Sequence, residues 1–234
     1  MEEETKKCPI HKVRAGLPPM IHRIASLPVD ERGYPVPFFV QWMENGKGVP
    51  RGQGQPDFRI VDPESLKACV RESRCWVCGD QLGVHRAYVV GPMCVINRTS
   101  AEPPSHVDCA EWSVQGCPFL SRPNMVRRED ELTESAAGNV AGFMIKRNPG
   151  VTVLWKIRNH LRMFRDGKGG VLFNIGDPEK VTWFKEGRVA TNEECIDAIN
   201  SGIKTLLDVC ETPEERNEVM EKRDRLVDSL RRLD

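Results

Sequence analysis

The stretch CWVCGDQLGVHRAYVVGPMCVINRTSAEPPSHVDCAEWSVQGC, residues 75–117, decides how this chain folds, because it holds five of the nine cysteines and two of the five histidines. A Cys-x-x-Cys pair, Cys75 and Cys78, precedes a His-x-x-Cys pair, His106 and Cys109. Two such pairs supply the four nitrogen and sulfur ligands that a tetrahedral zinc ion prefers. The sequence therefore predicts zinc as the cofactor and these four residues as its ligands.

The residues after the first pair predict a compact frame for the metal. Gly79 follows the second cysteine, as is typical of a zinc knuckle, whose next residue often needs a positive φ. The segments Arg86–Val90 and Met93–Asn97 flank Gly91-Pro92, and this pattern predicts a β-hairpin.

A helix is predicted to carry the second ligand pair. Ser105 predicts the N-cap of a helix that begins at His106, so that His106 and Cys109 share one side of the first turn. Knuckle, hairpin and helix in this order resemble a treble-clef zinc finger, and the resemblance implies that this segment wraps one zinc ion. Cys94 or Cys117 remains an alternative ligand in place of His106.

Other interpretations of the cysteines are weaker. Separate buried thiols are one alternative, since free cysteine is frequently buried. A redox Cys-x-x-Cys motif is disfavoured because no βαβ pattern surrounds Cys75. A four-ligand zinc site has no open position for water, so the pattern favours a structural zinc and a non-enzymatic protein.

Whether the chain is an enzyme stays open at this point. Treble clefs also frame the His-Me, or HNH, nucleases, and that resemblance would imply a base at His85, an asparagine at Asn97 and a metal ligand at His106. His106 cannot easily serve both as a structural zinc ligand and as a catalytic one, which argues against a nuclease. The competing enzyme hypothesis is a pocket beside the finger, built from Asn97, Arg98, Ser100, Glu102, Ser105 and Asp108, with Cys94 as a nucleophile.

Composition excludes several other classes. Lysine plus arginine equals aspartate plus glutamate at 34 each, so no global field attracts nucleic acid or an anionic membrane. No apolar run approaches the roughly 18–20 residues that span a bilayer, and the charged start lacks the apolar core of a secretory signal. We therefore expect a cytoplasmic protein that does not act on membranes, with cysteines available for metal.

The remaining pattern predicts an α+β fold. Asp62 and Pro63 predict the start of a helix that runs to Glu72, after short strands at Phe38–Met43 and Phe58–Val61 separated by a loop at Gly46–Pro56. Strand patterns at Val151–Ile157, Val171–Ile175 and Val181–Phe184 predict an antiparallel β meander. Capping signals at Thr191 and Thr212 predict two C-terminal helices. We divide the chain into a lead-in with short strands (1–62), a zinc-finger region (63–122), the meander (123–190) and a helical segment (191–234), all of which can form one domain.

One segment favours a binding role. Residues 155–169, WKIRNHLRMFRDGKG, carry basic side chains with aromatic residues interleaved. Such cations release counterions from phosphates, and aromatic faces stack on bases. The candidate nucleic-acid contacts are Lys156, Arg158, Arg162, Arg165 and Lys168.

The chain as a whole also resembles uncharacterised bacterial or phage proteins, through the GPMC motif at Gly91–Cys94, the PPSH…C motif at Pro103–Cys109 and the segment Trp183–Thr191. The resemblance implies a prokaryotic or viral setting and no activity. The sequence thus predicts a zinc-binding protein that acts through a macromolecular partner, either nucleic acid or another protein.

Overall fold

The computed structural model describes residues 11–122, 141, 150–159, 162–167 and 169–232. The α+β class is confirmed, with antiparallel strands and two helices at the C-terminal end. None of the helices in these described ranges combines the length and the apolar character needed to cross a bilayer.

A four-stranded antiparallel sheet organises the molecule. Its strand order is β10-β9-β6-β4, formed by β10 (Arg188–Val189), β9 (Lys180–Lys185), β6 (Thr152–Arg158) and β4 (His85–Val90). In register, Tyr88 lies opposite Trp155, and Trp155 lies opposite Val181. Strand β4 comes from the zinc-finger region and β6 from the predicted meander, so the sheet joins the two parts of the chain.

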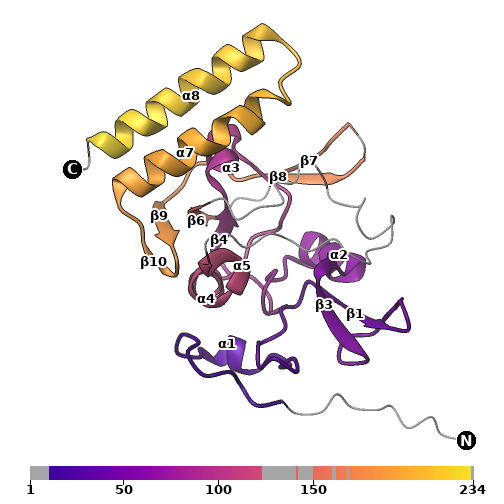
Figure 1. Cartoon of the computed structure of the whole chain (residues 1–234). Helices are drawn as coiled ribbons and strands as arrows, with labels where there is room; N and C mark the ends of the chain where they lie inside the picture. Colours follow the sequence, from indigo (N-terminus) through magenta and orange to yellow (C-terminus); the bar gives the residue numbers. More distant parts are fainter. Residues whose placement is uncertain (1–10, 123–140, 142–149, 160–161, 168, 233–234) are drawn as a thin grey trace, which may run out of the picture.

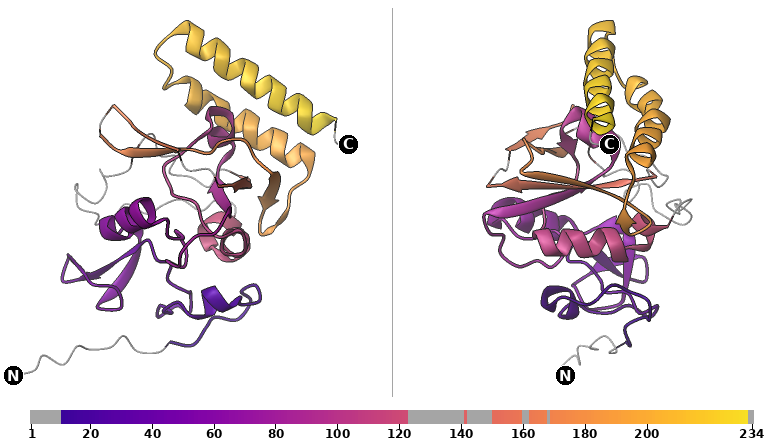
Figure 2. Two further views of the ribbon diagram at one scale, coloured as in Figure 1. Left: turned by 180° about the vertical axis from the view of Figure 1, so that it is seen from behind. Right: turned by 90° about the vertical axis from the view of Figure 1, so that its left-hand side faces the viewer.

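The two faces of this sheet are covered differently. Because side chains alternate along a strand, Leu154 and Phe184 point to one face, where they pack against α4 (Val107–Gly116). Val153, Trp155 and Trp183 point to the other face and join the main core under the remaining helices. These helices are α3 (Pro92–Asn97), α7 (Asn192–Leu207) and α8 (Pro213–Arg231). The right-hand view of Figure 2 shows α4 on one side of the strands and α7 and α8 on the other.

Two smaller sheets flank this core. One has the order β2-β1-β3, from β2 (Lys47–Val49), β1 (Val40–Glu44) and β3 (Gln55–Val61). The other has the order β5-β8-β7, from β5 (Thr99–Ser100), β8 (Val171–Asn174) and β7 (Arg162–Arg165). The short helices α1 (His22–Ala25) and α5 (Pro118–Ser121) and the longer α2 (Pro63–Glu72) complete the described elements.

The helix predictions that rested on caps are confirmed. Asp62 accepts hydrogen bonds from the backbone N–H groups of Glu64 and Ser65, and α2 ends at Glu72. Thr191 and Glu194 form a capping box at the start of α7, and Thr212 caps α8. A side-chain oxygen at an N-cap satisfies a backbone donor that has no partner inside the helix, which explains why these boundaries could be predicted from the sequence.

The predicted hairpin around Gly91-Pro92 is wrong. Residues 92–97 form the helix α3, and β4 pairs with β6 instead of with them. Pro92 occupies the first helical turn after Gly91, where its missing N–H costs nothing. Met93, Val95 and Ile96 are buried in the main core, so burial rather than strand alternation explains their apolar pattern.

Three further boundaries differ from the prediction. The N-cap of α4 is His106, not Ser105, and the helix begins at Val107. Part of the expected loop at Gly46–Pro56 is strand, since β2 pairs with β1 and β3 begins at Gln55. Among the meander strands, β6 and β9 are neighbours, whereas β8 pairs with β5 and β7 in a separate sheet.

Candidate metal centre

The first ligand pair lies on a tight turn that presents both sulfur atoms to the same side. The N–H of Cys75 donates to Asp80 O at 2.8 Å, and the N–H of Gly79 donates to Cys75 O at 2.9 Å. The N–H of Cys78 also points at Cys75 Sγ, 3.5 Å away. Gly79 has φ +81°, and a Cβ on it would lie 2.7 Å from Cδ2 of Phe38. The predicted positive φ at Gly79 is thus observed, and the position also lacks space for a side chain.

The second pair lies at the start of α4. His106 is the N-cap and Cys109 is the third residue of the helix, so both face the knuckle. The backbone N–H of His106 points at Cys75 Sγ at 3.4 Å. Nε2 of the His106 ring lies 3.0 Å from Gln81 O, to which it donates when it carries the proton. With the proton on Nε2, Nδ1 keeps a lone pair that can bind a metal. Most histidine ligands are oriented in this way, by a hydrogen bond from the ring nitrogen that does not bind the metal.

The four ligand atoms converge. The three sulfur atoms and one histidine nitrogen all lie within 4.8 Å of one another. Nδ1 of His106 is 3.4 Å from Cys78 Sγ and 3.9 Å from Cys109 Sγ. In a tetrahedral zinc site, bonds of about 2.3 Å to sulfur and about 2.0–2.1 Å to nitrogen leave neighbouring ligand atoms roughly 3.5–3.8 Å apart. The residues therefore fit a zinc ion with only small adjustments.

The electrostatics of the cluster also favour a cation. Burial raises the pKa of Cys75, but hydrogen bonds with Cys109, Cys78 and His106 lower it below the ordinary thiol value. Hydrogen bonds with Cys75 and Cys78 raise the pKa of Cys109, and hydrogen bonds with the same two cysteines raise the pKa of His106 to about 10. Three crowded thiols cannot all ionise unless positive charge balances them, and a divalent ion would replace the shared protons.

The N-terminal segment covers part of the site and leaves Cys78 partly exposed. Cys75 and Cys109 are both 0% exposed and belong to a small core that contains Ile24 and Leu27 from the region of α1. Arg23 of α1 donates to the carboxylate of Asp108 at 2.7 Å and thereby ties the cover to α4. Four protein ligands would fill a tetrahedral shell, an arrangement that is typical of structural zinc sites.

Comparison with protein-family models, curated proteins and solved structures gives no match for this chain. The site is therefore described by its own geometry alone.

The alternative ligands do not join the cluster. Of the cysteines in the described residues, Cys75, Cys78 and Cys109 contribute to it, whereas Cys94 and Cys117 do not. Burial raises the pKa of Cys94 to about 11, so this sulfur is a thiol at neutral pH and a poor nucleophile. Eight free cysteines are described, and none of these eight forms a disulfide.

The residues proposed for a nuclease do not assemble. His85 opens β4 and its Nδ1 lies 3.0 Å from a carboxylate oxygen of Glu179, whereas Asn97 is the last residue of α3. The Asn97 side chain accepts from the N–H of Thr99, and His106 is engaged at the cysteine cluster.

Five of the six residues proposed for a pocket beside the finger, namely Asn97, Ser100, Glu102, Ser105 and Asp108, line neither of the two cavities described below. Ser100 bonds to the backbone of Glu102, Ser105 is buried, and Asp108 is paired with Arg23. Arg98 points elsewhere and lines a cavity on the opposite face of the sheet.

The predicted basic set is divided between two sheets. Lys156 and Arg158 belong to β6, and Arg162 and Arg165 belong to β7. Lys168 lies outside the described residues. In Figure 1 the hairpin of β7 and β8 extends away from α4 and β10.

Two features of the site were not predicted from the sequence. Residues 1–62 were expected to form a lead-in with short strands, but α1 and Leu27 within this segment cover the cysteines. Lys180 and Arg188, which line a groove with Lys156, were also not predicted. The only sequence signal for the cover is the short apolar group at Met20, Ile21 and Ile24, which is too short to reveal a periodicity.

Proposed function

We propose that this chain is a zinc-binding protein in which the zinc is structural, and that it acts by binding single-stranded nucleic acid rather than by catalysis. The observation that carries the proposal is that the cysteine–histidine cluster fixes the first turn of α4, and α4 forms one wall of a cationic groove. The metal then serves the function indirectly, by holding that wall in place.

The metal-binding segment is a reduced version of a treble clef in this proposal. The knuckle precedes β4, and the residue just before the ligand helix pairs with that strand. Ala87 N–H donates to Ser105 O at 2.9 Å, and Ser105 N–H donates to Ala87 O at 2.8 Å. The hairpin of the motif is thus reduced to one pair of residues, with α3 inserted in its loop.

The groove lies on the α4 face of the sheet, between α4 and the turn that joins β9 to β10. It encloses about 560 Å³, and its floor is apolar and formed by Leu154 and Phe184. Its lining consists of Val107, Glu111, Gln115, Leu154, Lys156, Lys180, Thr182, Phe184, Gly187, Arg188 and Val189. At one end the walls approach closely, because a Cβ on Gly187 would lie 3.3 Å from Gln115 O.

The charges that line the groove suit a polyanion. Lys156, Lys180 and Arg188 oppose a single acid, Glu111. Lys156 lies 3.5 Å from Glu179, and Arg188 is held by Glu194, so these two cations are already paired. Lys180 has no ion-pair partner within the described residues, and it supplies a cation that a phosphate can use without breaking an ion pair.

Arg158 and the separate β7 surface, which lies away from the groove, carry further candidate contacts. Arg158 is exposed at the end of β6, on the same face of the sheet as Lys156 and Leu154. On β7, Arg162 and Phe164 share one face of the hairpin, and Phe164 is 45% exposed. An exposed aromatic ring beside an arginine can stack on an unpaired base while the arginine meets a phosphate. These residues favour a single strand over a duplex, whose bases are already stacked.

The test measures binding of fluorescently labelled oligonucleotides by anisotropy. We expect single-stranded DNA or RNA to bind, with an affinity that falls steeply as salt increases, because released counterions drive the association. The double variant Lys180→Glu/Arg158→Glu should weaken binding about tenfold or more and reduce the salt slope by about 1.4, since each lost phosphate contact removes about 0.7.

The matched control is Lys204→Glu, which reverses one exposed lysine on α7, away from the groove. It should bind like the wild-type chain. Binding that is absent at low salt, or equal in the double variant and the control, would contradict the nucleic-acid proposal while leaving the zinc site intact.

A further inference from the structure

A second cavity lies mainly on the opposite face of the sheet, away from the zinc ligands, and Thr182 and Val189 at the sheet edge line both this cavity and the groove. This second cavity lies between α3, β6, β9 and α8 and encloses about 710 Å³. We propose that it binds a nucleoside monophosphate, with the phosphate at its cationic rim and the base and sugar against its apolar wall.

The charge of the rim is of one sign. The charged residues that line the cavity are Arg98, Lys222 and Arg225, and within the described part of the chain no acidic side chain lines it. Two acids pair with rim cations from outside the lining: Glu218 pairs with Lys222 at 2.6 Å, and Asp177 lies 3.7 Å from Arg98. Both acids are well exposed, so water screens the electrostatic attraction between them and these cations. An incoming phosphate can therefore compete for the cations.

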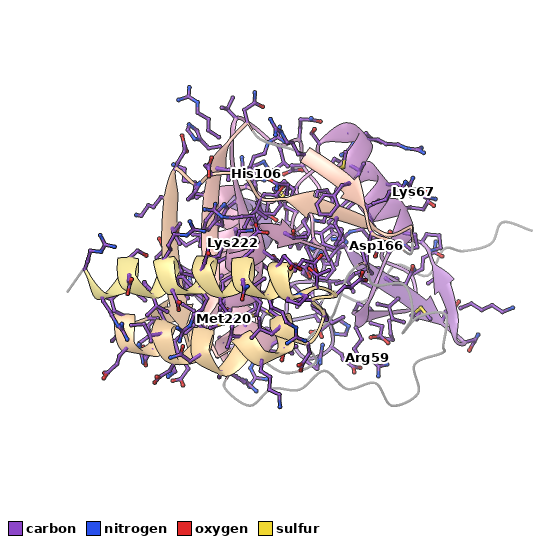
Figure 3. The ribbon with its side chains drawn as sticks, turned by 90° about the horizontal axis from the view of Figure 1, so that it is seen from above. Arg59, Lys67, His106, Asp166, Met220 and Lys222 are labelled. Carbon is purple, nitrogen blue, oxygen red and sulfur yellow. The ribbon has the colours of Figure 1, made fainter. Side chains whose placement is uncertain are left out.

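The rim draws its cations from two elements that are far apart in the sequence. Arg98 follows α3, whereas Lys222 and Arg225 occupy neighbouring turns of α8. Lys222 is labelled on α8 in Figure 3, where the helix crosses in front of the strands. Cations that converge from separate elements onto one opening can contact one phosphate from different sides, which a single charged helix face cannot do.

Arg98 is held in position before any ligand arrives. Its NH1 donates to Gly176 O at 2.8 Å. Its guanidinium also lies over the Trp155 ring, 4.5 Å from the ring centroid. Arg98 has φ +57°, a left-handed conformation that a residue with a side chain seldom adopts. The position of this guanidinium is thus set by the backbone, a carbonyl and an aromatic face, and a preorganised cation loses little entropy on binding.

The wall of the cavity is apolar and aromatic. Trp155 and Trp183 project from β6 and β9, and Val95 and Leu226 lie opposite them on α3 and α8. The volume lies in the range of about 300–1,000 Å³ that is usual for small-molecule sites, which combine apolar walls with a few polar groups. Trp155, Trp183 and Val95 are buried beneath the cavity, whereas Val181, Val189 and Leu226 keep apolar surface exposed in it. Inorganic phosphate would leave that surface exposed, so the geometry favours a phosphate ester with an apolar body.

The experiment is isothermal titration calorimetry of the full zinc-loaded chain with adenosine 5′-monophosphate and uridine 5′-monophosphate. Adenosine and inorganic phosphate are titrated in parallel, because they carry the apolar body and the anion separately. We expect saturable binding of at least one monophosphate, and at least about tenfold weaker binding of adenosine and of phosphate.

The variant Arg225→Glu should weaken monophosphate binding by about tenfold or more, because it places a carboxylate beside the phosphate. The control Arg216→Glu reverses an exposed arginine on the same helix that does not line the cavity. It should bind as the wild-type chain does. Both variants are checked for zinc content and thermal unfolding, so that misfolding is recognised, and Lys222→Glu replaces Arg225→Glu if the latter does not fold.

Three results would overturn the proposal. The first is the absence of saturable binding of either nucleotide up to about 10 mM, a concentration that corresponds to less than about 3 kcal/mol of binding free energy. The second is equal affinity of the rim variant and its control. The third is equal affinity for adenosine and its monophosphate, which would mean that the cationic rim plays no part.

Discussion

Replacing Cys109 by serine should reduce the dependence of this protein's thermal stability on zinc. Cys109 is 0% exposed, lies at the third position of α4 and places its sulfur 3.9 Å from Nδ1 of His106. A serine hydroxyl is a much weaker zinc ligand than a thiolate, so the variant would hold the ion with three ligands.

The expected magnitude follows from the number of ligands. Structural zinc contributes about 10–16 kcal/mol of apparent binding free energy in small zinc-binding peptides, so one ligand in four corresponds to roughly 2.5–4 kcal/mol. For a chain of this size, each kcal/mol shifts Tm by about 2–4 °C, so the zinc-dependent part of Tm should fall by about 5–16 °C.

The assay is a pair of thermal unfolding scans, one with excess zinc and one with a chelator, and the quantity compared is the difference in Tm between them. The matched control is Cys195→Ser in α7, a thiol that is 1% exposed and lies in the main core. The buried hydroxyl of Cys195→Ser should lower Tm. The decrease should be the same with and without zinc, because residue 195 is not part of the metal cluster. If Cys109→Ser retained the wild-type difference between the two scans, the assignment of Cys109 as a ligand would be refuted.

Three further predictions concern the knuckle, the helix caps and the protons of the site. Gly79→Ala should lower the free energy of unfolding by about 1–2 kcal/mol because of the positive φ, and the contact with Phe38 adds to this loss. The variant should also retain zinc less well in a chelator competition assay. Gly83→Ala is the control: its Cβ position has open space around it, so zinc retention should be unchanged. Thr191→Ala should lower the free energy of unfolding in urea by about 1 kcal/mol, because it removes the N-cap of α7; an unchanged midpoint would show that the capping box does not contribute. Acidification should release zinc into a colorimetric indicator, because protons compete with the metal for the thiolates and the imidazole; retention of the ion in strong acid would contradict a cysteine-rich site.

The parts of the fold that could be predicted from the sequence are those fixed by local chemistry. Asp62, Thr191 and Thr212 each accept hydrogen bonds from the backbone of the following turn, so their helices could be located from a few neighbouring residues. The ligand set was predictable for a similar reason, since two ligands three residues apart already face the same way on a tight turn or a helix start.

The parts that could not be predicted depend on distant contacts. Met93–Asn97 is apolar enough for a strand or a helix, and its packing against α7 decides for the helix. The partner of β4 is β6, which follows long after it in the chain, and a local pattern cannot identify such a partner. The cover over the cysteines comes from residues 20–27, whose short apolar group has meaning only beside the folded knuckle.

The basic segment shows how a linear pattern can mislead about a surface. Lys156 and Arg162 look like one run in the sequence, yet they belong to different sheets. Lys180 and Arg188, which the pattern did not include, line the groove with Lys156. The sequence therefore indicated that a cationic surface exists. Which residues form that surface depends on how the strands pair.

The central claim is that Cys75, Cys78, His106 and Cys109 together hold one zinc ion. The most direct test is the metal content of the full-length protein, purified without added zinc and measured by inductively coupled plasma mass spectrometry. The account predicts about one equivalent of zinc per chain, as a closed four-ligand site requires. Less than about half an equivalent in folded protein would contradict it.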